Sequence, residues 1–176
     1  MIHILENILP SDKADSIENT LIGGGHFPWY LKHHITYDNM VDNIDSIHYG
    51  YSHYFIAETN IESTYAWNVI PIITTIADKI DFNIKTVFNM RAFLHNPSTA
   101  PGTINSKHID MDIHHYSCIY YVNDSDGDTV FFDGDSDNII KRYTPKKNTA
   151  VFFEGSINHS STTPSQHRCI INTNLW

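Results

Sequence analysis

Two histidines and one aspartate in the C-terminal half of the sequence could bind a single metal ion. His108 and Asp110 form an H-x-D pattern, and side chains two positions apart in a strand leave the backbone on the same side. His159 follows a predicted strand and a turn at Gly155, and it can add a second imidazole. Two imidazoles and one carboxylate form the facial ligand set of non-haem Fe(II) centres, which leaves three coordination positions open for a bidentate ligand and O₂.

An arginine nine positions beyond His159 could add an anion site. Arg168 opens the alternating stretch HRCIINTNL, which predicts a strand with the Arg168 side chain pointing into the interior. A buried guanidinium needs an anion, and a carboxylate is its bidentate match. The sequence therefore predicts a carboxylate-binding position in the same half of the chain as the metal ligands.

Other residues could also bind a metal, because a chain with twelve histidines and many aspartates produces H-x-D pairs by chance. Asp112 has the same strand parity as Asp110. His114 and His115 lie close by and are interpreted as loop or substrate-side residues. Histidines without an ordered partner motif, or on the opposite strand face from Arg168, are interpreted as non-catalytic: His26, His33, His34, His48, His53 and His167.

Two helices in the N-terminal half are expected to pack on one sheet. The first begins near Ser11, the predicted N-cap, and stops at the glycines 23–25. The second runs from about Ile61 to Ile80, with Pro71 as a kink or boundary. From Ile84 to Leu94 the hydrophobic period changes to two, which indicates a strand, and further strands are predicted at Tyr116–Val122, Thr129–Phe132, Thr149–Phe153 and Arg168–Asn174. Short strands at this spacing are typical of a sandwich or jelly roll.

The composition narrows the class of protein. A chain of 176 residues with 41% hydrophobic residues can build one domain with a core of its own, and it contains no apolar run of membrane-spanning length. A net charge of −9 disfavours nucleic acid as a partner. The N-terminus has no signal-peptide pattern, so we expect a cytoplasmic location. Cys118 and Cys169 are expected to be buried free thiols.

The order of these motifs resembles the prolyl-hydroxylase-like branch of the Fe(II)- and 2-oxoglutarate-dependent dioxygenases over roughly residues 84–176. After the H-x-D pattern, the stretch 119–123 (IYYVN) is similar to that branch's I-Y-Y-L-N strand. The stretch 127–132 (GDTVFF) is similar to its G-G-x-T-x-F turn, with Asp128 at the second glycine, and His159 and Arg168 follow in the family's order. Small single-domain members occur in phages and bacteria, which implies the host cytoplasm if this chain is phage-encoded.

The resemblance implies a fold and a cosubstrate. The fold is mainly β with flanking helices (α+β): one domain over 1–176, with helical and β support over about 1–83 and a double-stranded β-helix (jelly roll) core over about 84–176. Fe(II) is bound by His108, Asp110 and His159, and the distal carboxylate of 2-oxoglutarate by Arg168 and Tyr121. His95 stands where the family often has a tyrosine that contacts the cosubstrate. O₂ is the co-reactant, and ascorbate is a candidate reductant.

The reaction implied is hydroxylation of a C–H bond, with succinate and CO₂ as coproducts. The resemblance favours a prolyl or other residue of a peptide or protein as substrate. The alternatives are a hydroxylase of a free amino acid or small metabolite, a cupin-like jelly roll that binds a metal or ligand without oxidation, and a zinc hydrolase. The aromatic-rich segment His26–Tyr54 is interpreted either as a substrate rim or as a β edge packed on the core. No oligomeric state follows from the sequence.

Overall fold

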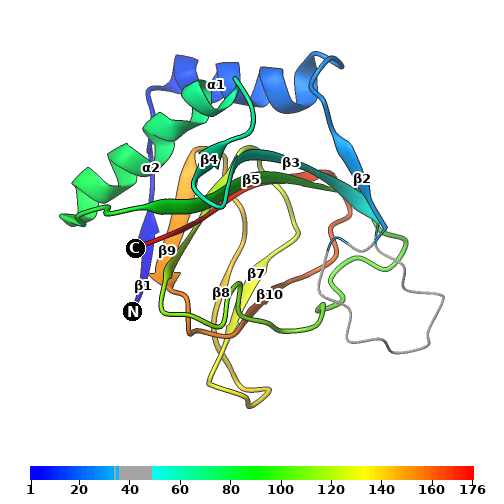
Figure 1. Cartoon of the computed structure of the whole chain (residues 1–176). Coiled ribbons are helices and arrows are strands. Elements are labelled where there is room, and N and C mark those ends of the chain that lie inside the picture. The colour runs from blue at the N-terminus through cyan, green and yellow to red at the C-terminus, as the bar shows by residue number, and fades with distance from the viewer. Residues whose placement is uncertain (34, 36–48) are drawn as a thin grey trace.

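The computed structural model describes residues 1–33, 35 and 49–176. Its largest element is an antiparallel sheet, which the chain crosses repeatedly (Figure 1). The strand order in this major sheet is β1 (Ile2–Leu5), β9 (Thr149–Glu154), β6 (Tyr116–Tyr121), β11 (Arg168–Leu175), β5 (Val87–His95), β3 (Gly50–Ala57) and β2 (Tyr30–Lys32), with β4 (Asn60–Ile61) paired to β3. Neighbours in this order are far apart in the sequence, as a jelly roll requires.

A second, minor sheet faces the major one. It contains β10 (His159–Ser161), β7 (Thr129–Phe132) and β8 (Ile139–Tyr143), in that order. An isolated antiparallel bridge between His108 and His159 brings the H-x-D segment alongside β10. The space between the sheets holds a small apolar cluster: Ile119, Tyr121, Phe131, Val151, Phe153 and Ile170. The expected fold, a mainly β jelly roll with flanking helices, is confirmed.

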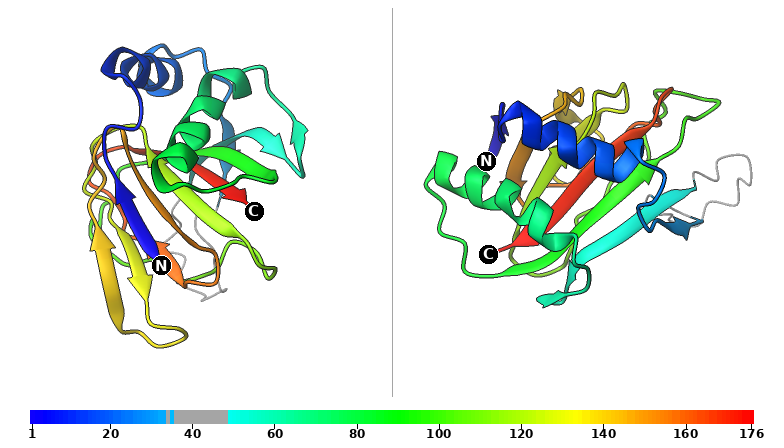
Figure 2. Two further views of the ribbon diagram at one scale, coloured as in Figure 1. Left: turned by 90° about the vertical axis from the view of Figure 1, so that its left-hand side faces the viewer. Right: turned by 90° about the horizontal axis from the view of Figure 1, so that it is seen from above.

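Two helices cover the outer face of the major sheet (Figures 1 and 2). They are α1 (Ser11–Glu18), which continues as a π-helical turn over Asn19–Gly23, and α2 (Ala66–Ile80). Every third or fourth residue of α2 is buried: Ala66, Val69, Ile72, Ile73, Ile76 and Ala77. These side chains join the larger core with the outward-facing residues of the strands. The predicted packing of both helices on one sheet is therefore what the structure contains.

Two predicted helix boundaries were wrong. Ser11 is the first residue of α1 and makes no capping hydrogen bond; the extended Pro10 precedes it, and the Pro10 carbonyl accepts the Lys13 and Ala14 N–H groups. Ile61 belongs to β4, because positive φ angles at Glu58 and Thr59 turn the chain back on β3. Its helical spacing with later isoleucines was therefore coincidental.

Pro71 neither ends nor bounds the second helix, since it lies inside α2. The missing N–H of a proline so near the helix start removes only one of the first intrahelical bonds.

Cys118 and Cys169 are buried and free, as expected. In the aromatic-rich segment 26–54, the described parts form the edge strand β2 and its neighbour β3, whereas His34, His48 and Tyr37 lie outside the described residues. In the described part of the chain, none of the helices has both the length and the apolarity needed to cross a membrane.

Truncating the α2 side chain that is most deeply packed on the sheet should destabilise the protein. Ile76 is 0% exposed, whereas Trp67 on the same helix is 65% exposed. We expect Ile76→Ala to lower the free energy of unfolding by about 2–5 kcal/mol, through lost burial and the cavity left behind. Trp67→Ala should change it by about 0.5 kcal/mol or less. Urea unfolding measures both, and equal effects would contradict the packing described.

Candidate metal and carboxylate site

The inward face of β11 carries the polar residues of the interior. Arg168, Asn172 and Asn174 share this face with Ile170, while Cys169 and Ile171 point to the helix-side core. The alternation follows from the two-residue period of a strand. The register pairs Arg168 with His95 and Asn172 with Arg91 on β5, so the inward face of that strand meets the same space.

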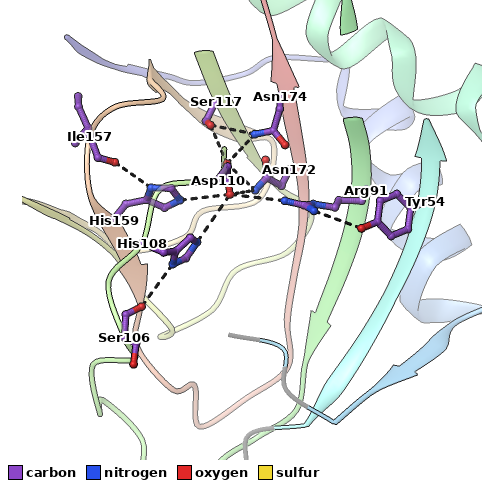
Figure 3. Close-up of polar contacts among 10 residues, drawn as sticks. All are labelled: Tyr54, Arg91, Ser106, His108, Asp110, Ser117, Ile157, His159, Asn172 and Asn174. Atoms are coloured by element: carbon purple, nitrogen blue, oxygen red, sulfur yellow. Dashed lines mark hydrogen bonds and ion pairs between the residues drawn. The ribbon is translucent and has the colours of Figure 1, made fainter. Parts of the chain in front are cut away.

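The structure brings His108, Asp110 and His159 together in that space (Figure 3). His108 and His159 exchange two backbone hydrogen bonds of 2.9 Å, which set the two rings side by side at 4.6 Å between centroids. The Asp110 Oδ1 atom lies 3.8 Å from Nε2 of His108 and 3.9 Å from Nε2 of His159. One candidate ligand atom from each residue lies within 4.8 Å of the others, which is a spacing that one metal ion can bridge.

Backbone carbonyls orient both imidazoles. The Nδ1 atom of His159 lies 3.1 Å from the Ile157 carbonyl, and that of His108 lies 3.5 Å from the Ser106 carbonyl. A carbonyl oxygen can only accept a hydrogen bond, so the ring nitrogen that faces it, Nδ1, is the one that carries a proton. The Nε2 atom of each ring then faces Asp110 with its lone pair. Burial, with the neighbouring His159, lowers the pKa of His108 to about 4. His108 is therefore neutral at pH 7, as a metal ligand must be.

Asp110 is a buried carboxylate. One of its oxygens accepts hydrogen bonds, and the other faces the two histidines. Its side chain is 2% exposed. Oδ2 accepts hydrogen bonds from Ser117 Oγ at 2.8 Å and Asn174 Nδ2 at 2.7 Å. Burial by itself raises the pKa of Asp110, but His159, Arg91 and His108 outweigh it and hold that pKa well below its usual range. Asp110 is consequently ionised, with Oδ1 directed at both imidazoles.

Arg168 carries a buried positive charge, and none of its hydrogen-bond partners is a carboxylate. The residue is 2% exposed. Its guanidinium donates to the Gly127 carbonyl at 2.7 Å and to Thr129 Oγ1 at 2.9 Å, and Nη1 lies 3.3 Å from His95 Nε2. Within residues 1–33, 35 and 49–176, no carboxylate lies at ion-pair distance from Arg168. Burial lowers the pKa of Arg168, and an incoming carboxylate would relieve that cost.

Tyr121 and His95, both predicted beside the cosubstrate, lie next to Arg168. The Tyr121 hydroxyl donates to Thr129 Oγ1 at 2.8 Å, and the Arg168 guanidinium carbon lies 5.9 Å from the Tyr121 ring centre. Burial raises the pKa of Tyr121, so its hydroxyl stays protonated and can donate a hydrogen bond. His95 lies directly opposite Arg168 across the β5–β11 ladder. Both predicted neighbours of the arginine are therefore within its reach.

The rival metal ligands do not join the cluster. Among the described residues, the group that could hold an ion contains His108, Asp110 and His159 alone. Asp112 and His114 are exposed, and the buried His115 directs Nδ1 at the Ile113 carbonyl at 2.7 Å. Of the histidines interpreted as non-catalytic, His53 packs between Phe27 and Phe55, while the exposed ones are His26, His33 and His167.

Sequence reasoning missed the polar residues that surround Asp110. They are Arg91, Ser117, Asn172 and Asn174. A signal existed for the two asparagines, because they lie four and six positions after Arg168 and thus on its face of the strand. Ser117 lies at the start of the predicted strand 116–122, and only the fold brings it to Asp110.

The donor set suits a divalent iron ion. Two imidazole nitrogens and one ionised carboxylate oxygen are the ligands that non-haem Fe(II) takes in its facial arrangement. Arg168 is buried and has no carboxylate at ion-pair distance among the described residues, so it suits one end of an acidic ligand between the two sheets. The residues therefore fit both groups that the sequence motifs implied.

Comparison with known proteins agrees with the geometry. Residues 94–176 match the model of the 2OG-Fe(II) oxygenase superfamily. No curated protein matches in sequence. A prolyl hydroxylase from Trichoplax adhaerens, solved with a hypoxia inducible factor peptide fragment, is similar in structure (TM-score 0.66, 12% identity, 99% of this chain and 83% of that one). So is a prolyl-4-hydroxylase from Pseudomonas putida (TM-score 0.63, 13% identity, 99% and 91%).

A third similar structure performs different chemistry. It is the non-haem α-ketoglutarate-dependent epimerase SnoN from nogalamycin biosynthesis (TM-score 0.65, 11% identity, 99% of this chain and 77% of that one). At such identities the solved structures show a shared fold. Residues 94–176, just under half of the chain, carry the 2OG-Fe(II) oxygenase domain, and the matched segment contains His108, Asp110, His159 and Arg168. The matched domain supports a 2-oxoglutarate-dependent dioxygenase, an enzyme class that uses Fe(II), 2-oxoglutarate and O₂.

Removing the amide that holds Asp110 should weaken metal binding. Asn174→Ala deletes the 2.7 Å hydrogen bond to Oδ2 and frees the carboxylate to rotate. Loss of such a supporting contact typically lowers metal affinity about 10- to 100-fold. Asn60→Ala, at the exposed strand β4, is the matched control and should leave metal affinity unchanged. Competition with a chelator for Mn(II) measures both, and equal affinities for the two variants would contradict this role.

Proposed function

We propose that this chain hydroxylates a C–H bond of a prolyl or other residue in a peptide or protein, releasing succinate and CO₂. In this proposal His108, Asp110 and His159 hold Fe(II), and Arg168 with Tyr121 holds the distal carboxylate of 2-oxoglutarate. The observation that carries it is that a set of two histidines and one aspartate and a buried guanidinium, which has no carboxylate partner among the described residues, occur together in the interior.

The protein residues hold the reactants in place and exclude water. Ser117 and Asn174 fix one oxygen of Asp110, so that a single carboxylate oxygen remains for the metal. The imidazoles of His108 and His159 would occupy two more positions on the metal, which would leave the rest for the cosubstrate and O₂. The apolar side chains between the sheets, including Phe131, Phe153 and Ile170, limit the access of water.

The groups held by these residues would supply the oxidation. When bound, Fe(II) with 2-oxoglutarate and O₂ would convert a substrate C–H bond to C–OH, with one oxygen atom of O₂ in the product and the other in succinate as CO₂ leaves. No side chain is required to act as a general base in this balance. The contribution of the protein is therefore to position the substrate C–H bond, and this positioning determines which class of substrate can react.

Two substrate classes have support. The prolyl hydroxylases among the similar structures favour a residue in a peptide or protein. The similar epimerase acts in the biosynthesis of a small molecule, which keeps a free amino acid or small metabolite as the second candidate. A non-oxidative cupin-like protein or a zinc hydrolase would have no use for Arg168 in its buried position. We also propose ascorbate as the reductant that sustains turnover.

The cosubstrate roles can be tested without a substrate. Adding 2-oxoglutarate anaerobically to the Fe(II)-loaded protein should produce the visible charge-transfer band of a chelated 2-oxo acid. In Arg168→Ala the band should require at least about tenfold more 2-oxoglutarate, because deleting one member of a buried charge pair costs about 2–5 kcal/mol. Arg142→Ala, which removes a partly exposed arginine ion-paired with Asp128, should match the wild type. Absence of the band in the wild type, or equal affinity in Arg168→Ala, would refute the assignment.

Substrate class can then be tested by product analysis. With Fe(II), 2-oxoglutarate, ascorbate and O₂, prolyl-containing peptides should stimulate succinate release and gain one oxygen atom in equal amounts. Free proline and unrelated amino acids should not stimulate it. Oxygen added to the free amino acids and to none of the peptides would favour the small-molecule alternative, and mass spectrometry separates the two outcomes.

A further inference from the structure

A second arginine of the interior, Arg91, lies beside the candidate metal ligands. It comes from β5, where it is paired with Tyr54 of β3 and with Asn172 of β11. Its guanidinium carbon lies 5.2 Å from the Phe93 ring centre and 5.9 Å from that of Tyr54 (Figure 3 shows Tyr54 beside it). Its side chain is 17% exposed, so the charge is largely removed from water. These contacts fix its position next to Asp110.

The hydrogen-bonding capacity of Arg91 is mostly unused. Nη2 lies 3.7 Å from Asp110 Oδ1, which is an ion-pair distance but too long for a hydrogen bond. Nη1 donates to the Tyr54 hydroxyl at the long distance of 3.4 Å. In the described part of the chain, the buried Nε atom has no hydrogen-bond partner. A guanidinium that served only to hold Asp110 would be expected to form short, bidentate bonds to it.

Asp110 does not need Arg91 to hold it. Ser117 and Asn174 already hold one of its oxygens with bonds of 2.8 and 2.7 Å, and the other oxygen faces the two histidines. When a divalent cation binds there, the charge of Asp110 is directed to the metal. Arg91 is then left as a desolvated cation with free donors, a situation that favours an additional anion.

The position of Arg91 complements that of Arg168. Arg168 lies opposite His95, and Arg91 lies four residues before His95 on the same inward face. Four residues of strand correspond to about 14 Å, with Phe93 and Ile170 between the two arginines. The interior thus offers one guanidinium at its far end and a second one beside the metal cluster.

We propose that Arg91 is a second carboxylate-binding residue of this active site, an inference that rests on the proposed function. The carboxylate comes either from the proximal end of 2-oxoglutarate, next to the metal, or from the substrate to be oxidised. Either source uses the same donors, the weakly engaged Nη1 and Nη2 atoms. Tyr54 and Phe93 keep the guanidinium plane in place for a bidentate contact.

The test uses Mn(II)-loaded protein, which binds 2-oxoglutarate without turnover, and isothermal titration calorimetry at saturating Mn(II). Arg91→Met keeps the aliphatic packing between Tyr54 and Phe93 but removes the donors, Arg91→Lys keeps the charge, and Arg142→Met is the control for overall charge. If the carboxylate belongs to the cosubstrate, Arg91→Met lowers 2-oxoglutarate affinity at least about tenfold. In that case Arg91→Lys recovers part of the loss and Arg142→Met stays within about twofold.

If 2-oxoglutarate affinity is unchanged in Arg91→Met, acetate is titrated into the protein that already holds Mn(II) and 2-oxoglutarate. Acetate binding to the wild type but not to Arg91→Met assigns the position to a substrate carboxylate. Unchanged behaviour in both titrations overturns the inference. So does a loss of Mn(II) affinity with intact 2-oxoglutarate and acetate binding, because that pattern would mean that Arg91 acts only by positioning Asp110.

Different results would contradict the role of Arg91 and the proposed function. If Arg168→Ala loses 2-oxoglutarate binding and Arg91→Met affects neither titration, the inference on Arg91 fails and the proposed function stands. If the wild type does not bind 2-oxoglutarate at all, the proposed function is overturned and this inference with it. Thermal unfolding of each variant, carried out alongside, verifies that the folded protein is being measured.

Discussion

The register of β11 against β5 and β6 determines where the charges of the interior lie. β11 is buried along its whole length between these two neighbours, and its side chains alternate between the helix-side core and the space between the sheets. A shift of one residue would move Arg168, Asn172 and Asn174 into the apolar core and expose Cys169 and Ile171 to the site. Since burying a guanidinium among aliphatic side chains is costly, that alternative is strongly disfavoured. The site is thus specified by the same pairing that builds the sheet.

Two buried charges of opposite sign are supported in different ways. Asp110 is surrounded by a hydroxyl, amides, imidazoles and the Arg91 guanidinium, so its negative charge is stabilised before any metal arrives. Arg168 is surrounded by a carbonyl, a hydroxyl and an imidazole, none of which cancels its positive charge. The surroundings of Asp110 keep it ready to act as a metal ligand. The surroundings of Arg168 favour the binding of an anion. Apolar side chains such as Ile170 and Phe131 form a buried cluster between the same two sheets.

Local patterns predicted much of this site, and long-range contacts account for the remainder. The two-residue period of HRCIINTNL correctly placed Arg168 inward, and the motif order brought His108, Asp110 and His159 into one hypothesis. The strands at 2–5 and 139–143 escaped prediction, and the first of them depends on a partner, β9, that is distant in the sequence. The predicted start of the second helix at Ile61 was wrong, because isoleucines recur at many spacings in this chain. Ser117 approaches Asp110 only once the sheet has formed, so no sequence spacing could identify it. Arg91 had a weak signal, because it lies four positions before His95 and thus on the same strand face.

The most direct test of the central claim is a crystal structure of the protein grown anaerobically with Fe(II) and 2-oxoglutarate, with iron located by its anomalous scattering. Iron should be bound by Nε2 of His108, Nε2 of His159 and one oxygen of Asp110. The distal carboxylate of 2-oxoglutarate should lie on the Arg168 guanidinium beside Tyr121. Iron bound by any other side chains, or a cosubstrate whose distal carboxylate lies away from Arg168, would contradict it.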